Sequence, residues 1–189
     1  DAQPFDTSGK SRVDWKDSTI RKWLNDDFYN SAFSEKEKEN IVESKSEGFE
    51  EYNTSMNLTG GGKPYAFLER ETEDKVFLLS NTELCAYFSE DPYPGCYSDP
   101  YAHKELLCYP TAYAKQQLKT RYQTETCGWW LCNHVYEDDS VELVSAYGQG
   151  SGTSRENIKA NTKSIAVRPA MWVTWQSDME MVEANQQVE

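Results

Sequence analysis

The sequence lacks several features that mark large functional classes. No stretch approaches the ~20 consecutive apolar residues of a membrane span. Basic residues are few, because 19 lysines and arginines face 32 acidic residues and leave a net charge of −13. A chain this acidic is repelled by phosphate backbones and by anionic lipid. We therefore expect neither nucleic-acid binding nor membrane insertion, and we attribute the charge to solubility.

Metal-binding patterns are missing as well. Cys127, Cys132 and His134 lie close together in sequence, but their spacing matches no zinc motif. The segment 137–139 (EDD) suits a polar turn better than a calcium site. No metal and no cofactor is expected. The odd number of cysteines leaves at least one unpaired within the chain, and we expect mostly reduced thiols, with one or two disulfides if the protein is exported. The cysteines are Cys85, Cys96, Cys108, Cys127 and Cys132.

Signatures of catalysis are scarce. His103 and His134 are the only histidines, and no GxSxG or cysteine-protease context accompanies any serine or cysteine. Among 32 acidic residues no carboxylate pair stands out. We do not expect an enzyme. The alternative is an unrecognised active site, which would need a histidine beside a carboxylate in a cleft.

Aromatic residues are abundant, at 13% of the chain, and predict a core built from large rings. The first segment with a clear pattern is a helix capped at Asp17 or Ser18. Ser34 and Glu37 form a capping-box signature for a second helix. The apolar residues at helical spacing are Ile20, Trp23, Leu24 and Phe28 in the first helix, and Ile41 and Val42 in the second.

The remainder of the chain contains short strands and two short helices, with the strands concentrated in the second half. Strands are predicted over 75–80, 127–133, 140–148 and 164–175, a helix follows Ser80, and another begins at Pro110 or Thr111. In the last helix Tyr113, Ala114 and Leu118 are expected to point inward. Helices first and strands later predict an α+β domain with an antiparallel sheet over residues 1–175, followed by a tail or linker over 176–189.

Two adjacent tryptophans give the main candidate for a binding surface. Trp129 and Trp130 point to opposite faces of a strand, so one belongs to the core. The other belongs to a second core layer, which is the favoured interpretation, or forms a platform for a sugar ring. Trp23 and Arg168 are interpreted as structural, with Arg168 in an ion pair or capping a backbone carbonyl. The candidate ligand-binding residues are Trp129, Trp130, Asn133, His134, Tyr136, Asp138 and Tyr147.

Five motifs occur in order along the chain: DSTIRKWLNDDFYNSAFSEKEK, TEDKVFLLS, PTAYA, GWWLCN and AVRPAMWV. From about Val13 to Val173 the set resembles an uncharacterised bacterial domain-of-unknown-function family, number 6273, whose members read RxWLN, DKVFLLS, PTxYA, WWLRS and GVRPALW. Cys132 and Asn133 replace the Arg and Ser of WWLRS, and Ala166 replaces the Gly of GVRPALW. DAQPF resembles the middle of the family's opening segment, so an N-terminal strand is expected before it.

The closing motifs resemble those of C-type-lectin-like domains of the formylglycine-generating-enzyme type. This resemblance implies helices packed on a twisted antiparallel sheet with long loops, in a surface or secreted bacterial protein; a cytoplasmic location is the alternative. The EPN and WND motifs of sugar-binding lectins are absent, and Cys127 and Cys132 lack the context of a copper site. Fold alone does not define function.

We therefore expect a non-catalytic binding module that recognises a glycan or a protein, with loops over 129–140 and 148–162 as its surface. An enzyme with an unrecognised site and a structural spacer domain are the alternatives. The sequence does not identify the ligand or the oligomeric state.

Overall fold

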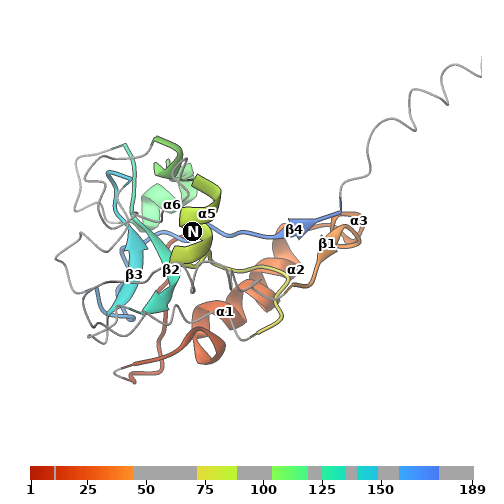
Figure 1. Ribbon diagram of the computed structural model, residues 1–189, viewed down its shortest axis with the longest axis horizontal. Coiled ribbons are helices and arrows are strands. Elements are labelled where there is room, and N and C mark those ends of the chain that lie inside the picture. Colours follow the sequence, from red (N-terminus) through yellow and green to blue (C-terminus); the bar gives the residue numbers. More distant parts are fainter. Residues whose placement is uncertain are drawn as a thin grey trace, which may run out of the picture.

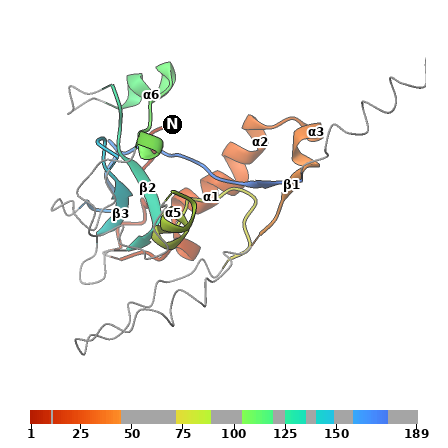
Figure 2. The same ribbon diagram turned by 45° about the horizontal axis from the view of Figure 1, so that its top comes forward.

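The computed structural model describes residues 1–10, 12–44, 72–88, 104–118, 125–134, 140–148 and 158–174 (Figure 1). Short helices accompany two antiparallel two-stranded sheets, which makes the fold α+β as predicted. Figures 1 and 2 show the two sheets at opposite ends of the described part, with the first helices between them. No helix among the described residues has the length and apolar character that a bilayer crossing requires.

The first predicted helix is confirmed, together with its cap. The Ser18 hydroxyl accepts a hydrogen bond from the Arg21 amide, as expected of an N-cap serine. Ile20 and Leu24 are buried on the inner side of the helix. The helix widens into a π-helical turn before its end. The 3-10 turn η1 (Trp15–Asp17) precedes the Ser18 cap, and the helix itself consists of α1 (Thr19–Trp23), η2 (Leu24–Phe28) and α2 (Tyr29–Ala32).

The second predicted helix is shorter than expected. The capping box of Ser34 and Glu37 is present at the start of α3 (Glu35–Lys38). The prediction that Ile41 and Val42 continue this helix was wrong, because they form strand β1 (Ile41–Val42). β1 pairs with β4 (Trp172–Val173), with Ile41 opposite Val173 and Val42 opposite Trp172. β-branched side chains fit a strand well, and this partner lies too far along the chain for a local pattern to reveal.

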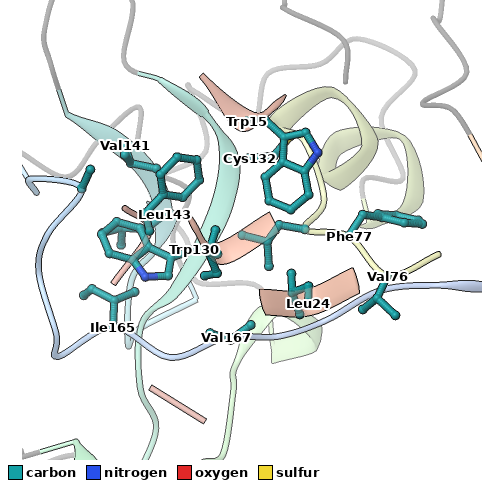
Figure 3. Close-up of a cluster of buried hydrophobic side chains, with 14 of the residues drawn as sticks. Trp15, Leu24, Val76, Phe77, Trp130, Cys132, Val141, Leu143, Ile165 and Val167 are labelled. Carbon is teal, nitrogen blue, oxygen red and sulfur yellow. The ribbon is translucent and has the colours of Figure 1, made fainter. Parts of the chain in front are cut away.

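The central ribbon is formed by β2 (Trp129–His134) and β3 (Val141–Val144), two predicted strands that pair antiparallel. Both faces of the ribbon are buried. Trp130 lies in a cluster with Trp15, Leu24 and Phe77 (Figure 3), whereas Trp129 lies in a second cluster. This arrangement follows from the alternation of side chains along a strand. The second cluster also contains Leu84, Leu106, Ala114, Leu118 and Val144.

The remaining helices cover the Trp129 face. They are α5 (Asn81–Phe88), η3 (Lys104–Leu106) and α6 (Ala112–Gln117). Both predicted helix starts are confirmed: Ser80 and Glu83 exchange hydrogen bonds at the start of α5, and the Thr111 hydroxyl accepts a hydrogen bond from the Ala114 amide at the start of α6. Ala114 and Leu118 point inward, but the prediction for Tyr113 was wrong, since its side chain is 60% exposed.

One strand prediction was wrong and another was too long. Residues 75–80 form no strand; Phe77 makes an isolated bridge with Ala170. In the segment 164–175, only β4 is a strand within the described part, although Ala166 also bridges Trp129. At the start of the segment, the Asn25 side chain bonds the backbone of Lys75 and Val76, and further along, Leu79 accepts a hydrogen bond from the Cys132 amide of β2.

The buried carboxylate of Asp74 connects the first helix to this extended segment. It accepts hydrogen bonds from Trp15 Nε1 at 2.9 Å, from Arg21 Nε at 2.7 Å and from the Thr72 hydroxyl at 2.6 Å. The Asn25 amide lies alongside and bonds both the N–H and the C=O of Val76. A buried charge is tolerated when it is paired and hydrogen-bonded in this way.

Replacing Asp74 with Ala should lower the free energy of unfolding by about 3–5 kcal/mol, because the Arg21 charge and the Trp15 N–H lose their common acceptor. Urea unfolding followed by tryptophan fluorescence measures this loss. Asp27→Ala, at an exposed position on the same helix, is the matched control and should change stability by less than about 0.5 kcal/mol. Equal effects of the two substitutions would contradict the role given to Asp74.

Candidate functional site

The tryptophan pair at the centre of the predicted site is internal. Both rings are fully buried. Trp129 Nε1 donates to the backbone oxygen of Leu106 at 3.0 Å, and Trp130 Nε1 donates to that of Gln3 at 2.9 Å. The polar end of each indole is therefore satisfied within the protein, and neither ring offers a face to a ligand.

The other predicted site residues do not assemble into one surface among the described residues. Asn133 is buried, whereas Tyr147 is 56% exposed. His134 lies in β2, but its side chain is outside the described set. Tyr136, Asp138, the acidic segment 137–139 and His103 also lie outside the described residues. Trp23 is half-buried and packs against Phe28 with ring centroids 5.3 Å apart.

Arg168 is held over an aromatic ring. Its guanidinium carbon lies 4.9 Å from the centre of the Trp129 ring and 6.0 Å from that of Phe88. Two of its nitrogens donate to the backbone oxygen of Glu105, at 3.3 and 3.4 Å. The side chain thus caps a carbonyl at the 3-10 turn η3 and makes a cation–π contact with a core tryptophan.

Two cysteines lie beside this arginine. Cys108 and Cys127 face each other in an isolated antiparallel bridge, in which the Cys127 amide donates to the Cys108 oxygen at 2.8 Å. The hydrogen bond from the Cys127 thiol, helped by the charge of Arg168, lowers the pKa of Cys108 to about 7 against the opposing effect of burial. The hydrogen bond to Cys108 and burial raise the pKa of Cys127. One thiol is therefore readily ionised while its neighbour stays protonated.

Aromatic side chains also reach the surface, on the β1–β4 sheet. Trp172 is 47% exposed, and the ring of Tyr87 from α5 stands against it edge-on, with centroids 6.1 Å apart and an interplanar angle of 82°. Val42, directly opposite Trp172 in the strand pair, is 39% exposed. We call Val42, Tyr87 and Trp172 the aromatic patch. Paired residues of antiparallel strands share a face, so these side chains form one surface.

Sequence reasoning missed the aromatic patch because Trp172 was placed in one long apolar strand. Nothing local distinguishes the exposed Trp172 from the buried Trp129 and Trp130. A two-residue strand is too short for its periodicity to show which face is solvated.

Within the described ranges, no three His, Cys, Asp or Glu side chains are grouped so that they could hold a metal ion.

The chain belongs to a family described as a domain of unknown function, DUF6273, whose model matches residues 1–175. No curated protein and no solved structure matches the chain.

Alkylation should reveal the ionised thiol. The rate of Cys108 modification by iodoacetamide, followed by mass spectrometry, should reach half its maximum near pH 7 and rise with pH, because the thiolate is the nucleophile. Cys127→Ala should move this midpoint upward, since the strongest contribution to the lowered pKa is lost. A midpoint at about 8.5 in the unmodified protein, the value of a free cysteine, would contradict the assignment.

Proposed function

We propose that the protein is a non-catalytic binding module that recognises a neutral glycan at the aromatic patch. The observation that carries the proposal is the half-exposed indole of Trp172, held in place by Tyr87 and flanked by Val42. A tryptophan packed on one side and open on the other offers a flat apolar surface whose position is fixed before a ligand arrives.

The chemistry of the patch suits a sugar ring. The C–H face of a pyranose stacks on an indole, while the hydroxyls at the edge of the sugar need polar partners. Such partners lie next to the patch in the chain: Thr174 follows β4 and Asn40 precedes β1. The two residues are joined by a backbone hydrogen bond of 2.8 Å and by the Thr174 hydroxyl, 3.3 Å from Asn40 Oδ1. An amide and a hydroxyl at the rim of an apolar plate are the groups that orient a ligand.

Charge supports a neutral ligand over an anionic one. The net charge of −13 disfavours phosphate-bearing and acidic polymers through long-range repulsion. Uncharged saccharides experience no such repulsion. Nucleic acid is therefore excluded from the proposal.

The proposal includes a C-type-lectin-like architecture and a location on the surface of a bacterium or outside it. Both rest on the similarity of the closing motifs, GWWLCN and AVRPAMWV, to those of lectin-like domains. The absent EPN and WND motifs remove the calcium-dependent mode of sugar binding, and stacking on Trp172 replaces it in the proposal.

Thermal unfolding against a panel of neutral oligosaccharides tests the proposal. A glycan at ~100 times its dissociation constant should stabilise the fold by about 2.7 kcal/mol, which raises the Tm by roughly 5–10 °C for a chain of this size. Trp172→Ala should abolish the shift, and Trp172→Phe should keep part of it. EDTA should have no effect.

Tyr147→Ala is the matched control, because Tyr147 is similarly exposed but follows β3, at the other end of the described part (Figure 2). This variant should keep the full shift. A shift that survives Trp172→Ala would place binding elsewhere and refute the role of the patch. A cooperative unfolding transition that no glycan moves would favour the structural spacer.

A further inference from the structure

We propose that Cys108 and Cys127 form a redox modification site, at which a reversible disulfide is made by exchange with a small disulfide such as glutathione disulfide. The site is separate from the aromatic patch, and the inference does not depend on any ligand bound there. It rests on the position of the two thiols in the fold and on the cationic side chain beside them.

The backbone geometry suits a disulfide. Cys108 and Cys127 are direct partners in an antiparallel bridge. Residues in this relation have Cα atoms about 4.5 or 5.5 Å apart, within the span of about 4.4–6.8 Å that disulfides occupy. Both side chains belong to the cluster that contains Trp129, and the Cys127 thiol donates a hydrogen bond to the backbone oxygen of Cys108 at 3.5 Å. Bond formation therefore requires side-chain rotation and little movement of the backbone.

The two cysteines differ in a way that suits a nucleophile and a resolving thiol. Cys108 is half-buried, so a small disulfide can reach it, whereas Cys127 is 7% exposed. Arg168, fixed over Trp129 and by the Glu105 carbonyl, lies near Cys108 and favours its thiolate. Thiol–disulfide exchange begins when a thiolate attacks a sulfur of the disulfide. A neighbouring arginine favours the thiolate form of the attacking cysteine.

The exchange balances in two steps. The Cys108 thiolate attacks one sulfur of glutathione disulfide, which forms a mixed disulfide and releases one glutathione thiolate. Cys127 then gives its proton to that thiolate and attacks the Cys108 sulfur, which releases the second glutathione thiolate. The protein loses two electrons, which glutathione disulfide accepts. The first step also removes the Cys108 charge, one of the causes of the raised pKa of Cys127, so the second thiol becomes easier to ionise.

Cys132, the third cysteine whose side chain the structure describes, does not compete for Cys127. Cys132 is buried in the cluster of Trp130, on the opposite face of β2 from Trp129. Cys127 belongs to the cluster that contains Trp129. The ribbon backbone therefore separates Cys127 from Cys132, and the geometry assigns Cys108 as the partner of Cys127.

The proposal is tested by oxidising the full chain with glutathione disulfide, trapping free thiols with N-ethylmaleimide and mapping linked peptides by mass spectrometry. Cleavage by chymotrypsin after Trp129 or Trp130 separates Cys127 from Cys132. We expect a 108–127 link that dithiothreitol removes. Because the bond closes a loop across a sequence separation of 19, the Tm should rise by roughly 5–10 °C on oxidation and fall back on reduction.

Single-cysteine variants supply the controls. Cys108→Ser and Cys127→Ser should each abolish the link and the Tm shift, and Cys127→Ser should leave the mixed disulfide with glutathione trapped at Cys108. Cys85→Ser should leave both readouts unchanged. A link from Cys108 or Cys127 to Cys85 or Cys96 would overturn the pairing. Two free thiols at 108 and 127 after oxidation, detected by N-ethylmaleimide in the unmutated chain, would overturn the proposal.

Discussion

The described structure depends on one buried carboxylate. Asp74 accepts hydrogen bonds from the side chains of Trp15, Arg21 and Asn25, which lie 49 to 59 residues earlier in the chain. It thereby holds the first helix against the extended segment that follows Thr72. Asn25 completes the connection, because its side chain accepts the backbone hydrogen bonds of Lys75 and Val76 that a neighbouring strand would otherwise accept. Phe77 and Leu78 are thereby fixed in the core. The motifs RKWLN and DKVFLLS meet in this polar cluster, since Arg21 and Asn25 belong to the first and Asp74 to the second.

Local interactions made much of this fold predictable. The caps at Ser18, Ser34, Ser80 and Thr111 each accept a hydrogen bond from the backbone N–H three positions further along the chain, and those at Ser18 and Ser34 were predicted from their sequence patterns. The burial of both faces of β2 followed from the alternation of Trp129 and Trp130. The positions of Ile41 and Val42 were mistaken because their partners, Val173 and Trp172, lie far along the chain. Helical periodicity carries no information about such a partner.

The candidate sites were harder to predict for the same reason. A tryptophan in an apolar run is usually buried, and the exposure of Trp172 depends on which elements happen to cover it. The cysteine pair was missed because the two residues do not form a CxxC motif. They come together only through an antiparallel bridge between distant segments. Arg168 illustrates the intermediate case. A largely apolar neighbourhood indicated that its charge needs a partner, but only the structure shows that the partner is a carbonyl and that a ring lies beneath the guanidinium.

The last described segment, 158–174, touches nearly every other part of the fold. Ala166 bridges both Ala2 and Trp129, Ala170 bridges Phe77, and Val173 pairs with Ile41. A hydrogen bond joins Thr174 to Asn40 across a sequence separation of 134. Contacts at such separation slow folding, because a large loop must close before they form. During synthesis the core around Trp130 therefore stays incomplete until the segment that carries Ile165 and Val167 has left the ribosome.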